Sequence, residues 1–215
     1  MGYPIISLNV GKPQTQVFDG KALVTGFIKT PIHDRDYLTM TGFEQDGQAD
    51  LKNHGGPEKA LLMYPKDHYA YWDETYKRTF DYPSFGENIT IDGLTEKDLF
   101  IGDIFQLGQA EIQCSQPRQP CFKIAKTHGI PDMPKLVTDT GFSGYYFRVI
   151  KEGYVSPEDT LIKREEDEDK VTPFEIFDCL FHDRKNAERM ERYLSLEKLA
   201  PNVKNSFRKR IEKFG

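Results

Sequence analysis

The sequence has few cysteines, and their spacing matches no common scaffold. Its three cysteines, Cys114, Cys121 and Cys179, form no CxxC pair and no paired-cysteine zinc motif, and their odd number argues against a disulfide framework. They also lack the spacing of an iron–sulfur site, and no GxGxxG follows a predicted strand. We therefore expect a protein of a reducing compartment.

Long apolar runs and an excess of positive charge are also missing. Hydrophobic residues make up 38% and charged residues 29%, and no apolar run approaches the roughly 18 residues of a membrane span. The first seven residues show no basic segment followed by an apolar one, so we expect no export signal, no membrane association and a cytoplasmic location. The net charge of −5 argues against nucleic-acid binding, although a basic cluster lies near the C-terminus.

One stretch, residues 116–123, holds a cysteine in a stiffened and cationic setting. Pro117 and Pro120 restrict the backbone, so Cys121 should be presented at a defined place. Arg118 and Lys123 favour the thiolate, which attacks electrophiles or binds soft metals. Two interpretations stay open here: a reactive thiolate, or a buried cysteine in a rigid loop whose two cations face solvent.

A second candidate is the glycine pair that follows His54. Gly55 and Gly56 let the backbone approach a ligand closely, while His54 and Lys59 supply a hydrogen-bonding ring and a positive charge. Such a loop could hold a phosphate or a polar heterocycle. The alternative is an ordinary Gly-Gly turn with an incidental histidine.

Further polar residues sit near predicted strands. Glu87 and Asn88 follow Gly86 at a strand entrance, which alone is weak support for a site. Arg148 lies in a predicted strand, on the face opposite Phe147. It is either a cation directed into the site or a surface ion-pair partner.

Short alternating segments predict a mainly β fold of the barrel or sandwich type. In the segment 110–115, apolar Ala110, Ile112 and Cys114 share one face, so Cys114 is expected in the core. Residues 65–76 predict a short helix whose aromatic stripe packs into the core, and a Pro-rich turn is expected at 130–134. The predicted strands are residues 5–10, 22–28, 37–42, 99–104, 110–115 and 141–150.

The composition changes at residues 163–170, which predict a solvated linker and divide the chain into residues 1–162 and 163–215. After it the apolar period becomes helical. Thr172 to Glu175 matches a capping box with proline at the first helical position. Helices at 186–194 and from Pro201 onward complete three short helices, packed on the main domain or on each other.

Taken in order, the motifs resemble the MOSC domain, and among its members the YiiM type, which carries a C-terminal three-helix extension. The likeness runs from about residue 5 to 162 and continues into the helices. It implies a MOSC-type β-barrel with short peripheral helices. The residues that carry it are Asp50, His54–Gly56, Lys59–Ala60, Phe85–Asn88, Gly102–Asp103, Gln116–Arg118, Pro120–Cys121, Lys123, Gly141, Ser143–Gly144, Tyr146 and Arg148–Val149.

This resemblance implies an enzyme that binds the molybdenum cofactor, a pyranopterin dithiolene with a phosphate, and needs no pyridoxal phosphate. Cys121 would be the molybdenum ligand and a catalytic residue. His54 is a candidate proton donor, with Glu87 second. The residues expected to bind the cofactor are Gly55, Gly56, Lys59, Asn88, Arg118, Lys123 and Arg148.

Family members of this type reduce N-hydroxylated compounds such as 6-hydroxylaminopurine. The cofactor would supply the chemistry that removes the oxygen from the N–OH group. We therefore expect a small N-hydroxylated substrate and a separate flavin-type or iron–sulfur electron donor, and leave a homodimer open. The alternative is a cofactor carrier or a sulfur-transfer protein that uses a Cys121 persulfide.

Overall fold

The computed structural model describes residues 2–18, 20–49 and 55–214 as a β-barrel with short helices. Its strands are β1 (Gly2–Val10), β2 (Gln14–Phe18), β3 (Lys21–Thr25), β4 (Thr30–Pro31), β5 (Asp36–Thr39), β6 (Gly42–Phe43), β7 (Leu61–Pro65), β8 (Ile89–Ile91), β9 (Ile104–Leu107), β10 (Ala110–Pro117), β11 (Tyr145–Lys151), β12 (Gly153–Val155) and β13 (Thr160–Glu165). Its helices are η1 (Pro57–Lys59), η2 (Lys66–His68), α1 (Tyr69–Tyr76), α2 (Phe122–His128), α3 (Met133–Thr140), α4 (Pro173–Phe181), α5 (Ala187–Ser195) and α6 (Pro201–Phe214). The mainly β fold class is confirmed.

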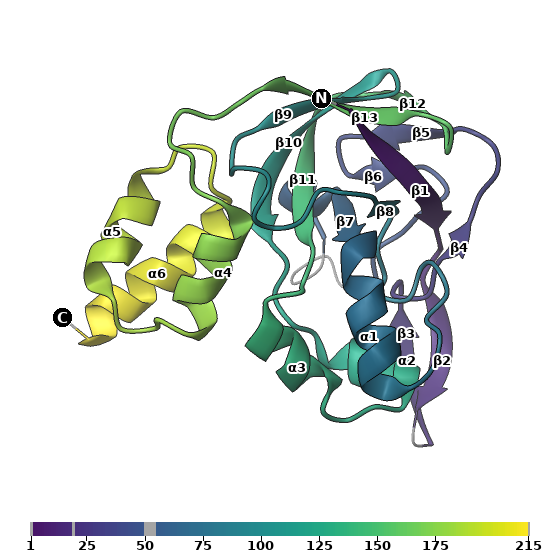
Figure 1. The fold of residues 1–215 in the computed structure, drawn as a ribbon, viewed down its shortest axis with the longest axis horizontal. Helices are drawn as coiled ribbons and strands as arrows, with labels where there is room; N and C mark the ends of the chain where they lie inside the picture. The colour runs from purple at the N-terminus through teal and green to yellow at the C-terminus, as the bar shows by residue number, and fades with distance from the viewer. Residues whose placement is uncertain (1, 19, 50–54, 215) are drawn as a thin grey trace.

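The main sheet closes on itself. Its hydrogen-bonded order is β13, β9, β10, β11, β7, β8, β1 and β4, and a further pairing of β1 with β13 joins all but β4 into a ring (Figure 1). Strands β7 and β8 run parallel, and the other paired strands of the ring run antiparallel. Because side chains alternate along a strand, each strand of the ring buries one face inside the barrel.

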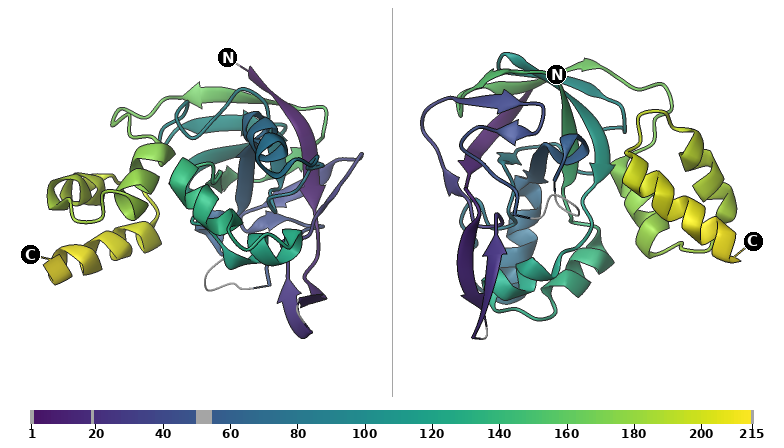
Figure 2. Two further views of the ribbon diagram at one scale, coloured as in Figure 1. Left: turned by 60° about the horizontal axis from the view of Figure 1, so that its bottom comes forward. Right: turned by 180° about the vertical axis from the view of Figure 1, so that it is seen from behind.

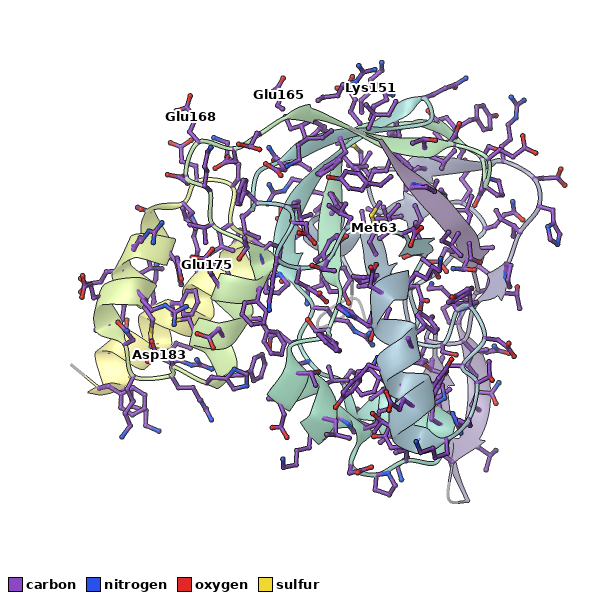
Figure 3. All side chains as sticks on the ribbon, viewed as in Figure 1. Met63, Lys151, Glu165, Glu168, Glu175 and Asp183 are labelled. Carbon is purple, nitrogen blue, oxygen red and sulfur yellow. The ribbon has the colours of Figure 1, made fainter. Side chains whose placement is uncertain are left out.

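The alternation predicted for β10 and β11 is confirmed. Ala110, Ile112 and Cys114 of β10 are fully buried in the barrel core, together with Phe147 of β11. Met63 of β7 lies inside the same ring (Figure 3). Cys114 is therefore a core residue, and burial raises the pKa of its thiol well above the ordinary range.

We expect Cys114→Ser to destabilise the fold. The substitution places a hydroxyl where the thiol now has no solvent exposure, and burying a hydroxyl without a full set of partners costs about 1–3 kcal/mol. Chemical denaturation measures this as a lower unfolding midpoint with an unchanged slope. A midpoint equal to that of the wild type would contradict the apolar surroundings of the sulfur.

Several predicted boundaries differ from the structure, and local geometry explains two of them. The strand expected at 99–104 begins only at Ile104, because Gly102 has φ +101° and the Asp103 carboxylate accepts the N–H of Phe100 at 2.9 Å, which makes a turn. The turn expected at 130–134 leads into α3 at Met133, since proline is tolerated in the first helical turn.

Helices α1, α2 and α3 lie together at one end of the barrel (Figure 1). They enclose a second cluster of buried aromatic residues. Trp72 of α1 is fully buried, and its indole N–H donates to the hydroxyl of Tyr64 at 2.6 Å. Tyr64 in turn stacks on Phe85, with 4.3 Å between ring centroids. The interpretation of the α1 aromatic stripe as core packing is confirmed.

Helices α4, α5 and α6, which we call the helical unit, lie on one side of the barrel in both views of Figure 2, and α4 packs against β10. Thr172 and Glu175 form the predicted capping box. Strand β13 continues to Glu165, so the first residues of the predicted linker are strand, and Lys163 pairs with Asp103 at 2.8 Å. None of the described helices is both long and apolar enough to cross a membrane.

Candidate functional site

A pocket with about 560 Å³ of empty space, its open mouth included, lies where the end of β10 meets several loops. The predicted strand 22–28 ends at Thr25, which leaves Gly26 and Phe27 in a loop that forms one wall. The lining residues are Gly26, Phe27, Lys29, Asp46, Gly47, Gln48, Ala49, Lys59, Leu62, Gly86, Asn88, Arg118, Cys121, Lys123 and Tyr146. The pocket brings together five of the residues predicted for the site: Lys59, Asn88, Arg118, Cys121 and Lys123.

Cys121 is held at this pocket by the end of one element and the start of another. Strand β10 ends at Pro117, and Cys121, in extended conformation with φ −123° and ψ 134°, precedes the first residue of α2. Pro120 fixes the preceding backbone. The residue is 8% exposed, and it lines the pocket. The cysteine is thus buried, as the second interpretation expects, but it faces a cavity, and Arg118 and Lys123 are buried instead of facing solvent.

Positive side chains dominate the pocket wall. Lys29, Lys59, Arg118 and Lys123 line it, against the single carboxylate of Asp46 among the described lining residues. Lys29 forms an ion pair with Asp46, and burial lowers the pKa of the Lys29 ammonium although the Asp46 carboxylate opposes this. The charge of Lys29 is therefore already balanced.

Two of these cations favour an anionic ligand. Arg118 is 7% and Lys123 is 9% exposed, and neither side chain forms a hydrogen bond or ion pair with a residue in the described ranges. Arg118 contacts the ring of Phe27, whose centroid is 5.6 Å from the guanidinium carbon. Because a charge buried without a counter-charge is costly, the pair is suited to a ligand that carries negative charge.

Asn88 links the pocket to the barrel. Its amide oxygen accepts the N–H of Leu62 at 3.1 Å, and its amide nitrogen donates to Asp46 at 2.8 Å. The side chain is 4% exposed. Asn88 therefore fixes the Asp46 and Leu62 walls of the pocket relative to each other.

The structure places Glu87 and Arg148 outside this pocket. The fully buried Glu87 carboxylate accepts from the hydroxyl of Tyr69, from Thr90 and from the N–H of Phe85, so it serves the aromatic cluster rather than proton donation in the pocket. Arg148 pairs with Glu58. Of the two possibilities left open for Arg148, the structure shows the ion pair.

The glycine pair lies beside the pocket without lining it. The N–H of Gly56, which has φ +90°, donates at 3.3 Å to the side chain of Gln48, a lining residue. Gly55 precedes it and is half-buried. The predicted role of His54 falls on a residue outside the described ranges.

Comparison with known proteins identifies two domains in this chain. The MOSC domain matches residues 50–162, and the YiiM-like, 3-alpha helix domain matches residues 174–214. The chain belongs to the MOSC family. YflK of Bacillus subtilis is 44% identical over 98% of this chain and 96% of its own length, and protein YiiM of Escherichia coli is 37% identical over 98% and 93%.

The structural relatives lead to the same family. The crystal structure of YiiM from Geobacillus stearothermophilus has a TM-score of 0.83 at 36% identity, covering 97% of this chain and 99% of that one. A protein of Gibberella moniliformis named reductase is 30% identical over 73% of this chain, which spans only 28% of that longer protein. The YiiM-type MOSC fold with C-terminal helices is thus shown.

The MOSC pocket also contains residues that sequence reasoning missed. Lys29 and Asp46 come from loops between short strands, where no motif marks them. Tyr146 was named among the residues that carry the family resemblance, but it was given no role in the site. It lines the pocket beside Arg118, and burial raises the pKa of its hydroxyl while the guanidinium opposes this.

The donor set of this MOSC pocket fits a molybdenum cofactor. Among the described residues, no group of three His, Cys, Asp or Glu side chains could hold a metal ion, so the pocket offers a single soft ligand, Cys121. A dithiolene-bound metal brings its other sulfur ligands with it. Lys59, Arg118 and Lys123 are placed to offset the negative charge of such a cofactor and its phosphate.

Proposed function

We propose that this chain is a cytoplasmic molybdenum cofactor-dependent reductase of N-hydroxylated compounds such as 6-hydroxylaminopurine. The observation that carries the proposal is one buried cysteine lining a pocket whose other charged residues are mostly cations. Membership of the MOSC family supports it, and so does the relative named reductase. The small N-hydroxylated substrate would enter through the open mouth of the pocket.

The residues of the chain would bind and orient the cofactor. Cys121 would be the metal ligand, while Arg118 and Lys123 would neutralise negative charge from the α2 side and Lys59 from η1. The bound cofactor would supply the two-electron chemistry that removes oxygen from nitrogen. Phe27 and Tyr146 would exclude water from the inner wall.

The reaction requires a partner. Reduction of an N–OH group to N–H consumes two electrons and two protons, breaks the N–O bond and releases the oxygen as water. Since the sequence has neither an iron–sulfur cysteine set nor a dinucleotide fingerprint, the electrons would come from a separate flavin-type or iron–sulfur protein.

Elemental analysis with turnover tests this function. Protein produced in a host that makes the cofactor should contain about one molybdenum per chain, show pterin fluorescence after denaturation, and reduce 6-hydroxylaminopurine when a flavin reductase supplies electrons. Removal of the cofactor should abolish turnover. A wild-type protein without molybdenum but with labile sulfur on Cys121 would instead establish the sulfur-transfer alternative.

A further inference from the structure

Glu58 connects the cofactor pocket to the helical unit. It lies in η1, one residue before the pocket cation Lys59. Its carboxylate accepts from Nε of Arg148 at 3.2 and 3.1 Å, and from a terminal nitrogen of the same guanidinium. Arg148 therefore holds the carboxylate that is adjacent to Lys59 in the sequence.

The backbone of Glu58 is held as firmly as its side chain. Its carbonyl oxygen accepts from Oγ of Ser115 at 2.7 Å and from Nε2 of Gln116 at 3.2 Å. Ser115 and Gln116 are almost fully buried at the end of β10, and the carbonyl of Tyr146, 3.0 Å from Oγ of Ser115, shares the one hydroxyl hydrogen with Glu58. The Lys59 ammonium lies over the ring of Tyr146, 5.7 Å from its centroid. The hydrogen bonds of Ser115 and Gln116 therefore fix the backbone on both sides of this contact.

The three residues that bond to Glu58, namely Arg148, Ser115 and Gln116, also bond to residues 196–202 of the helical unit, which we call the α5–α6 corner. Each of the three has one partner there. The carbonyl of Lys198 accepts from Arg148 at 2.7 Å, the N–H of Ala200 donates to the carbonyl of Ser115 at 3.0 Å, and the amide of Asn202 donates to Gln116 at 2.8 Å.

We propose that the α5–α6 corner, acting through Arg148 and Gln116, positions Lys59 in the pocket, so that the helical unit is part of the anion-binding site. Arg148 and Asn202 are then positioning residues. Without Arg148, the free Glu58 carboxylate would compete for the Lys59 ammonium; without Asn202, the Gln116 amide would lose the bond that orients it toward Glu58. The proposal rests on the proposed function only in taking the pocket to bind an anionic group.

The positive potential at Cys121 can be measured in the cofactor-free full-length protein. The probe is the ratio of alkylation rates with iodoacetate, which is negatively charged, and iodoacetamide, which is neutral. The ratio cancels the thiolate fraction and the accessibility of the sulfur. Cys114 and Cys179 have no solvent exposure, and a Cys121→Ser protein corrects for any reaction there.

Four variants carry the test. Lys59→Met sets the full effect, a ratio lowered about 4-fold, as Coulomb's law gives for one charge removed from roughly 5 Å in water. Arg148→Met should lower it by a similar factor. Asn202→Ala should lower it about 2-fold, and since it changes no charge, its effect can come only from geometry. The matched control is Arg189→Met, which removes ion pairs to Asp178 and Asp183 inside the helical unit.

The outcomes separate the inference from its alternatives. Lowered ratios in Arg148→Met and Asn202→Ala, with a wild-type ratio in Arg189→Met, support positioning by the corner. A wild-type ratio in Asn202→Ala, whose folding circular dichroism confirms, overturns it. A ratio lowered equally in Arg189→Met also overturns it, because general loosening would then explain the effect. Absence of molybdenum from the wild type, with the ratios as expected, would defeat the proposed function alone.

Discussion

Replacing Cys121 with serine is expected to abolish molybdenum retention and reductase activity while leaving the fold intact. A hydroxyl is a hard, poorly ionised ligand that cannot replace a thiolate on a dithiolene-bound metal. Mutation of a residue that hydrogen-bonds to a metal ligand typically lowers metal affinity or activity by about 10–100-fold. Loss of the ligand itself should therefore lower activity by more than about 100-fold. Elemental analysis and turnover on the same preparation measure both effects.

The fold should survive because the sulfur does not cap α2. Cys121 precedes α2 in extended conformation and makes no side-chain cap hydrogen bond to that helix. Serine is a preferred residue at such a position. The thermal midpoint of Cys121→Ser should therefore lie within about 2 °C of the wild type.

Cys179→Ser is the matched control. Cys179 is buried in α4 of the helical unit, and burial raises the pKa of its thiol to about 11, so it is a poor metal ligand. This variant should keep its molybdenum and its activity. A Cys121→Ser protein that retained both metal and rate would refute the assignment of the ligand.

The sequence predicted those parts of the fold and the pocket that depend on neighbouring residues. Period-two patterning placed Cys114 in the core, because a strand buried on one face leaves no other arrangement. Arg118, Cys121 and Lys123 lie within six positions, so the turn that presents one presents all three. The capping box at Thr172 is likewise a local signal, and all of these are found in the structure.

Features that depend on distant contacts could not be predicted in this way. Lys29 and Asp46 meet at the pocket only because the barrel folds their loops together. Arg148 is an example. Strand alternation predicted the face of the sheet on which its side chain lies, but only the folded structure shows that Glu58 pairs with it on that face. The strand predicted from residue 99 begins only at Ile104, because the Asp103 carboxylate closes a turn and also pairs with Lys163 of β13.

A buried carboxylate behind the pocket carries the second large expected effect. Glu96 is 2% exposed, and it accepts from the N–H of Ser143 at 3.1 Å, from the N–H of Gly144 at 2.6 Å, and bonds to Nε2 of His68 at 2.7 Å. The carbonyl of Gly144 accepts the N–H of Arg118 at 2.9 Å. Glu96 therefore fixes the turn on which the pocket arginine rests.

Glu96→Ala should destabilise the protein by about 3–5 kcal/mol, since it leaves two backbone N–H groups and the His68 ring buried without their acceptor. For a chain of this size, that corresponds to a fall in the thermal midpoint of about 6–20 °C. Scanning calorimetry measures it. At temperatures where the variant remains folded, molybdenum content should also fall, because the loosened turn no longer places Arg118.

The matched control is an exposed carboxylate whose ionic partners are Lys170 and, at 3.6 Å, Lys163. Glu166 pairs with Lys170 at 3.1 Å, and both side chains are largely exposed. Because solvent screens such pairs, Glu166→Ala should leave the thermal midpoint and the molybdenum content unchanged. If Glu96→Ala had the same thermal midpoint as Glu166→Ala, the Ser143–Gly144 turn would not depend on the Glu96 carboxylate. If it melted early yet kept its molybdenum, Arg118 would be held by other contacts of β10.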